Sequence, residues 1–263
     1  MFSKDDWGVF GLVANLGSLV ARLVFQPMEE TARLVFAKLS QQQDGARDTA
    51  HIITLLIRLM ILMALFCVAF GPPYAFSVIH LLYGTKWSSS SAPSLLAFYS
   101  FHLCLCALNG VTEAFVSATA GQKQLQLQNL LMVGFSGVYV GAAVYSAPTL
   151  GLMGLVAANC LGMGLRIAYS TTFIHRHFAG TGLMSIGGIV PSVRLVVAVL
   201  GAGVVARLSA ARMETDPPLM RGQLLHVAVG VGLFGSSLVA LRYLDPEFVH
   251  ALVAMRRGRP RTE

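Results

Sequence analysis

The amino-acid sequence predicts an all-α membrane protein with about seven transmembrane helices, and three observations carry this prediction. Of the 263 residues, 55% are apolar and only 12% are charged, whereas about 25% of the residues of a soluble domain are charged. The mean hydropathy is +0.67. Several uninterrupted apolar runs approach the ~20 residues that a helix needs to cross ~30 Å of hydrocarbon. This composition excludes a secreted disulfide-built domain and a nucleic-acid-binding protein.

The first two predicted spans both contain prolines. Residues 8–39 form one apolar segment that we expect to be kinked or broken at Pro27. Residues 52–70 form the second span, which Gly71, Pro72 and Pro73 are expected to stop. The next ten residues, 74–83, are too few to span and predict a loop or an interfacial helix.

The remaining segments are expected to complete a single transmembrane domain over residues 1–263. A tight turn is predicted at Pro148, and a basic tail is predicted to follow the last span over residues 242–263. Because this tail and the loops are short, they leave no room for a soluble domain. The remaining predicted spans cover residues 95–118, 127–147, 150–174, 187–208 and 224–241.

The net charge of +7 predicts the orientation of the chain rather than a nucleic-acid partner. With seven crossings, the Lys and Arg residues outside the spans divide nine to five between the two sides of the membrane. The more basic side contains the Arg-rich C-terminal tail. The positive-inside rule therefore predicts a cytosolic C-terminus.

Polar residues inside membrane spans are costly, and two spans repeat the same pair. Asn15 and Arg22 lie seven residues apart in the first span, and so do Asn159 and Arg166 in the fifth. A spacing of seven places both members of a pair on one helical face. The third span adds Asn109 and Glu113 at i,i+4, which also share a face. All three helices are predicted to run in the same direction.

Two interpretations of these residues stay open. They could line a cationic cavity that faces the cytosol and binds an anionic group such as a lipid diphosphate, with Arg58 in support, because arginine offers fork-shaped donors. They could instead be hydrogen bonds and ion pairs that hold the bundle together. Arg58 and Arg194 could also extend to the membrane surface without any partner.

A second polar group follows Pro27, where Glu29 and Glu30 stand between two arginines, Arg22 and Arg33. We expect Pro27, Glu29, Glu30 and Arg194 to have gating or structural roles. Pairing of Glu29 with Arg33 at i,i+4 is the simpler alternative.

Motifs of catalysis are missing from the sequence. It contains no Gly-rich phosphate loop, HExxH, CxxC or nucleophile-elbow motif, and no acidic pair of the kind that binds a metal-bound sugar nucleotide. The chain also lacks the sequence marks of a G-protein-coupled receptor. We therefore expect no enzyme activity, no metal site and no cofactor.

Several strings of residues resemble the Rft family of endoplasmic-reticulum membrane proteins. NLGSLVAR (Asn15–Arg22) and FQPMEE (Phe25–Glu30) form the most specific part of this resemblance. Further matching strings are LNGVTEAF (Leu108–Phe115), ANCLGMGLRI (Ala158–Ile167) and FIHRHF (Phe173–Phe178). The resemblance extends from about Asp6 to the tail.

The resemblance implies a flippase-like fold and a function in N-glycosylation. The family is similar to multidrug, oligosaccharidyl-lipid and polysaccharide exporters, which have two six-helix lobes and, in some members, extra C-terminal helices. This chain would be one lobe with the C-terminal helices, and the same gene or a partner chain would supply the missing N-terminal lobe. The implied partner is a dolichol-diphosphate-linked oligosaccharide, which the family moves across the endoplasmic reticulum membrane or helps to move.

Two alternatives to this implied function remain. The protein could be a non-transporting scaffold or chaperone of the glycosylation machinery, with the polar residues used only for packing. It could also transport another amphipathic solute, because a cationic cavity would not discriminate between such solutes.

Overall fold

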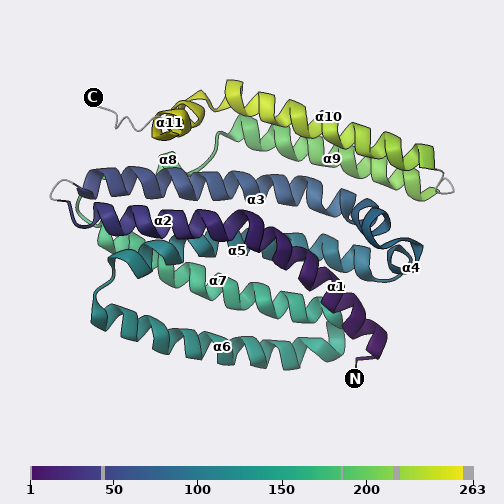
Figure 1. The fold of residues 1–263 in the computed structure, drawn as a ribbon, viewed down its shortest axis with the longest axis horizontal. Helices are drawn as coiled ribbons and strands as arrows, with labels where there is room; N and C mark the ends of the chain where they lie inside the picture. The colour runs from purple at the N-terminus through teal and green to yellow at the C-terminus, as the bar shows by residue number, and fades with distance from the viewer. Residues whose placement is uncertain (1, 43–44, 185, 216–219, 257–263) are drawn as a thin grey trace.

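A computed structural model describes residues 2–42, 45–184, 186–215 and 220–256, and this part of the chain is helical with no β-strand. Seven of its helices are long and apolar enough to cross a membrane, and they lie side by side along the long axis of the molecule (Figure 1). The predicted all-α membrane fold is confirmed. The seven helices or helical segments cover Lys4–Leu39, Gly45–Tyr83, Ala92–Thr119, Gln122–Leu150, Leu152–His177, Val193–Arg212 and Gly222–Leu244.

The first span is continuous but irregular. It consists of α1 (Lys4–Val20), a π-helical turn η1 (Ala21–Phe25) and α2 (Gln26–Leu39). The Gln26 N–H donates to the carbonyl oxygen of Ala21, five residues back. Pro27 has no N–H to continue the α-helical pattern, and a wider turn directly before it accommodates the ring. The predicted irregularity is therefore a π-turn that ends two residues before Pro27, and the helix is not broken.

The second span is longer than the sequence predicts. Helix α3 (Gly45–Tyr83) passes through Pro72 and Pro73 and includes residues 74–83, so the prediction of a stop followed by a loop or interfacial helix is wrong. Beyond the prolines the helix changes direction (Figure 1). Ending a helix inside a membrane would leave further backbone groups without either water or a helical partner, so a helix bends at proline where a soluble one would end. A single turn, α4 (Thr85–Ser88), follows.

The next three helices form the centre and one outer edge of the bundle. They are α5 (Ala92–Thr119), α6 (Gln122–Leu150) and α7 (Leu152–His177). The turn between α6 and α7 is at Gly151, which has φ +59°, and not at Pro148, which lies inside α6. Glycine adopts a positive φ without strain and ends the helix, whereas Pro148 fixes only a φ that helices already have.

The C-terminal helices form a separate hairpin. A short helix, α8 (Ile186–Ile189), leads into α9 (Val193–Thr215), which pairs with α10 (Met220–Leu244), and α11 (Pro246–Arg256) follows. The first half of the predicted basic tail is therefore helical, and residues 257–263 lie outside the described residues. Both α9 and α10 pack against α3.

The seven spans place the loops in two groups. The C-terminal ends of α2, α5 and α7 lie at the same end as α11, and those of α3, α6 and α9 lie at the opposite end with the start of α1 (Figure 1). The nine-to-five count of Lys and Arg residues outside the spans assumes the same assignment of loops to the two sides of the membrane. Helices α1, α5 and α7 run in the same direction, as expected (Figure 1).

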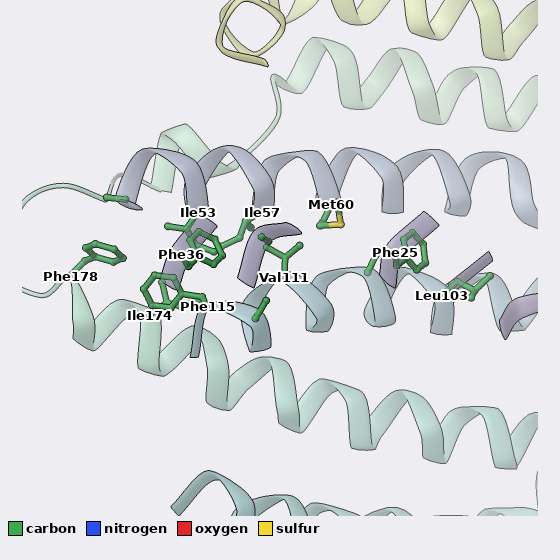
Figure 2. Packing of buried hydrophobic residues seen from close by; sticks show 14 residues of the cluster. Phe25, Phe36, Ile53, Ile57, Met60, Leu103, Val111, Phe115, Ile174 and Phe178 are labelled. Atoms are coloured by element: carbon green, nitrogen blue, oxygen red, sulfur yellow. The ribbon is translucent and has the colours of Figure 1, made fainter. Parts of the chain in front are cut away.

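Helix α5 is the centre of the packing. It contacts α1, α2, α3 and α7, and more than half of its most apolar stretch is buried, whereas none of that stretch of α6 is. Near the end that contains α11, Phe36 of α2 and Phe115 of α5 meet edge to face with their centroids 5.3 Å apart. Ile53 and Ile174 close around this pair (Figure 2). Burial of these apolar side chains against α5 holds α2, α3 and α7 in place.

Candidate functional site

The polar residues after Pro27 meet those of α5. The Arg33 guanidinium donates to the Glu29 carboxylate at 2.8 Å, so the predicted intrahelical pair is confirmed. Glu29 also lies against α5, because a Cβ at Gly110 would be only 3.1 Å from Glu29 Oε2. On α5, Asn109 Nδ2 donates to Glu113 Oε2 at 2.8 Å. The structure thus brings together polar side chains from two of the sequence motifs.

This group contains two carboxylates and one guanidinium. Glu113 acts on Glu29 as a nearby like charge, and Arg33 offsets it. Asn109 is buried, and its Oδ1 atom has no hydrogen-bond partner. The group is therefore net acidic and does not by itself offer a site for an anion.

The first of the two Asn–Arg pairs lies on the surface of the bundle. Asn15 and Arg22 are both exposed. The Arg22 guanidinium turns back along its own helix, where Nη2 donates to Ser18 Oγ at 2.9 Å and Nε donates to the Ser18 carbonyl oxygen at 3.3 Å. Among the described residues, no carboxylate pairs with Arg22, so its positive charge is uncompensated.

The second Asn–Arg pair is on α7. Asn159 and Arg166 are half-buried. Arg166 has neither a hydrogen bond nor an ion pair with any residue that the structure describes. Both α7 and the π-turn that contains Arg22 pack against α5, so the two unneutralised arginines lie on helices that share one neighbour.

Arg58 has a different environment from the one expected. Its Nη2 atom lies 2.7 Å from both oxygens of Asp245, and Nη1 donates to the Gly188 carbonyl oxygen at 3.2 Å. Its guanidinium carbon also lies 5.6 Å from the centre of the Phe248 ring. The Arg58 side chain is 13% exposed and that of Asp245 is 3% exposed. Arg58 is closed within an ion pair, so we remove it from the candidate anion contacts.

The sequence interpretation missed Asp245 because this residue follows the last predicted span. One signal points to it: Asp245 directly precedes Pro246, the first residue of α11. An Asp before a Pro is a common start of a helix. A buried arginine also needs an acidic partner.

The other expected gating or structural residues have no shared location. Pro27 and Glu30 are exposed, and Glu30 accepts a hydrogen bond at 3.0 Å from Gln26 on the same helix. Arg194 is exposed at the start of α9, and α9 packs against α3 rather than against α2. The candidate set therefore divides into an acidic group at α2 and α5, two uncompensated arginines, and residues of the C-terminal hairpin.

Comparison with known proteins relates this chain to one family. A family model described as Rft protein matches residues 1–255. The chain is 33% identical over 241 residues to the Man(5)GlcNAc(2)-PP-dolichol translocation protein RFT1 of Xenopus tropicalis, which covers 88% of this chain and 44% of the relative. The relative of the same name from Mus musculus is 33% identical over 259 residues, covering 94% and 47%.

A more distant relative of the same name, from Saccharomyces cerevisiae, is 31% identical over 176 residues, 65% of this chain and 31% of the relative. No solved structure matches. The chain spans about half the length of the vertebrate relatives that it matches.

Proposed function

Because this chain belongs to the Rft family, we propose that it contributes one lobe, with the C-terminal helices, to a protein of N-glycosylation. That protein would move a dolichol-diphosphate-linked oligosaccharide across the endoplasmic reticulum membrane, or would support that step. The names of its relatives describe translocation of such a lipid. A translocation step breaks no covalent bond and requires no catalytic residue. The family therefore supports the expectation that the protein is not an enzyme.

The observation that supports this proposal most directly is the pair of uncompensated arginines. An arginine in a membrane span normally pairs with an acidic group or faces a polar cavity, because an isolated charge in hydrocarbon is costly. Arg22 and Arg166 have no acidic partner among the described residues. A lipid diphosphate is an anion that could neutralise them, and guanidinium groups bind phosphate oxygens through paired hydrogen bonds.

The neighbouring polar residues would have supporting roles. Asn15 and Asn159 share the helical faces of the two arginines and would hydrogen-bond the sugar or phosphate groups. Asn109 and Glu113, already hydrogen-bonded to each other, would hold α5 in register between the two arginine-bearing helices. Glu29 would neutralise Arg33 through their ion pair.

The length of the relatives supports a second lobe. Flippase-like transporters alternate access by rocking one lobe against another, and the relatives are about twice as long as this chain. We propose that the missing lobe lies across from α1 and α7. In the endoplasmic reticulum membrane, α11 and the basic tail would face the cytosol.

Substitution of Arg166 tests the proposed phosphate contact. In cells depleted of their own Rft protein and supplied with the protein that carries this chain, we expect Arg166→Gln to reduce glycan occupancy of a reporter glycoprotein. Loss of one charge-assisted hydrogen-bonding group costs about 1.5–3 kcal/mol, which corresponds to a tenfold or greater loss of lipid binding. Arg166→Lys should retain part of the activity, because lysine keeps the positive charge but lacks the planar guanidinium that donates two hydrogen bonds to a phosphate.

The matched control is Arg242→Gln, which removes the same charge from an exposed position at the end of α10. We expect full occupancy with this variant at equal expression. Normal glycosylation with Arg166→Gln would contradict a role for the charge.

One observation keeps the scaffold alternative open: several polar residues in the spans have a partner within the described chain, among them Arg58, Arg33 and Glu113. Reconstitution distinguishes the two functions. A purified protein that restores glycosylation in cells, yet moves no labelled lipid-linked oligosaccharide in vesicles, would favour the scaffold.

A further inference from the structure

A cavity of about 1,090 Å³ lies between the C-terminal hairpin and the rest of the bundle. Helices α9 and α10 form one wall, and α3, α4 and the start of α5 form the other. Helix α4, which contributes to the lining, lies at the end of the bundle opposite α11 (Figure 1). Its volume is comparable to that of sites that bind small organic molecules.

One face of this cavity carries hydrogen-bond donors and positive charge. Arg207 lines it and has no hydrogen bond or ion pair with the described residues. Arg212 also lines the cavity. The buried Nε2 atom of Gln223, another lining residue, has no acceptor in the part of the chain that the structure describes. Among the lining side chains that the structure describes, none is acidic, so this part of the lining is complementary to an anion.

The remaining walls are apolar. Hydrophobic side chains from both sides line them, namely Phe76, Ala97, Val205, Leu208, Leu225 and Val229. A small soluble anion would gain nothing from these walls. A ligand with a charged head and a hydrocarbon chain would contact both parts, and the end of a set of membrane spans is where lipid headgroups lie.

A buried histidine of α10 joins the two walls of the cavity. His226 of α10 stacks on Tyr74 of α3 with ring centres 4.2 Å apart. Its Nε2 atom lies 3.2 Å from the Pro73 carbonyl oxygen, and Nδ1 lies 3.0 Å from Ser209 Oγ. The carbonyl can only accept, so Nε2 carries the proton and Nδ1 accepts from the serine hydroxyl. The cavity is thus bounded by a hydrogen-bonded contact rather than by loose packing.

We propose that this cavity binds one phospholipid with an anionic headgroup. The phosphate lies at Arg207, and an acyl chain lies along Val205, Leu208 and Val229. This site is distinct from the proposed substrate contacts at Arg22 and Arg166, because α9 and α10 pack against α3 whereas Arg166 is on α7. The lipid would remain bound and would fill the space between the C-terminal hairpin and helices α3, α4 and α5.

Native mass spectrometry of the purified chain in neutral detergent tests the site. The probes are dioleoyl phosphatidylglycerol, which is anionic, and dioleoyl phosphatidylcholine, which has no net charge. We expect phosphatidylglycerol to bind at least about tenfold more tightly. Arg207→Gln should remove this preference, because a tenfold change corresponds to about 1.4 kcal/mol, less than the value of one charge-assisted hydrogen bond.

The matched control is Arg242→Gln, which has the same change of charge at the other end of the hairpin. We expect it to bind phosphatidylglycerol as the unaltered chain does. A second variant, Ala97→Phe, fills the cavity and should reduce the binding of both lipids while leaving the thermal midpoint of the lipid-free protein within a few degrees.

Any one of four results would overturn the proposal. Equal loss of binding with Arg207→Gln and Arg242→Gln would show a non-specific charge effect. Equal affinity for the two phospholipids would exclude a headgroup site. Displacement of phosphatidylglycerol by inorganic phosphate at millimolar concentration would assign the cavity to a soluble anion, and preferential binding of dolichyl phosphate would assign it to the translocated substrate.

Discussion

Replacement of Arg58 by methionine is expected to lower the free energy of unfolding by about 3–5 kcal/mol. The substitution leaves the Asp245 carboxylate, which is 3% exposed, buried without its partner. It also removes the hydrogen bond to Gly188 and the contact with the Phe248 ring. A large fall in the thermal midpoint of the purified protein would be the readout.

Two further variants separate the ion pair from general effects of removing an arginine. Arg194→Met removes an exposed arginine at the start of α9 and should change stability by no more than about 0.5 kcal/mol. The double variant Arg58→Met with Asp245→Leu should recover much of the loss, because an apolar pair of similar volume can replace a buried ion pair. If Arg58→Met and Arg194→Met were equally mild, Asp245 would not depend on Arg58.

Replacement of Gly203 by leucine is expected to displace the C-terminal hairpin from α3. A Cβ at Gly203 would lie 2.9 Å from the Ala69 carbonyl oxygen and 3.0 Å from its Cα. These atoms belong to a helix backbone, which cannot move aside as a flexible side chain can. Overpacking of this kind costs about 1–3 kcal/mol, and the larger leucine side chain places this variant at the upper end. Thermal midpoint and the rate of proteolysis between α9 and α10 would report the change.

The chain offers a matched control two residues away. Gly201 is on the same helix, is exposed, and has no neighbour within 4 Å of a built Cβ. Gly201→Leu should therefore be close to neutral, or slightly stabilising because leucine has the higher helix propensity. Equal effects at the two positions would mean that α9 does not approach α3 as closely as the structure shows.

Both predictions concern the attachment of the hairpin to α3, which includes a buried ion pair. On the hairpin side, Arg58 is enclosed with Asp245. On the side of α1 and α7, Arg22 and Arg166 have no acidic partner among the described residues. This difference between Arg58 and the two arginines supports the proposal that the side of α1 and α7 meets an anionic substrate, while the ion pair of Arg58 and Asp245 fixes the hairpin to α3.

The hydropathy pattern predicted each span but not how the spans end. Apolar runs of about 20 residues are a local property, so counting them identified all seven helices. The boundaries at Pro72, Pro73 and Pro148 were wrong because proline rules come from helices in water, where a freed carbonyl can be solvated. The rule that glycine ends a helix at positive φ was the better guide at Gly151.

The candidate site was predictable only within single helices. The pairing of Glu29 with Arg33 and of Asn109 with Glu113 follows from i,i+4 spacing. The partner of Arg58 does not, because Asp245 is 187 residues away along the chain. The same limit applies to His226 and Tyr74, whose contact joins a predicted loop to the last span.

The sequence by itself determined that this protein is a bundle of seven apolar helices of the Rft type, because composition and helical spacing are read one segment at a time. Only the tertiary structure decided which charges are neutralised and which are not, since that depends on contacts between helices far apart in the chain. Because no water in the membrane can solvate an unpaired charge, these contacts determine the role of each arginine. Arg58 pairs with Asp245 and is structural, whereas Arg22 and Arg166 pair with no acidic residue in the described chain.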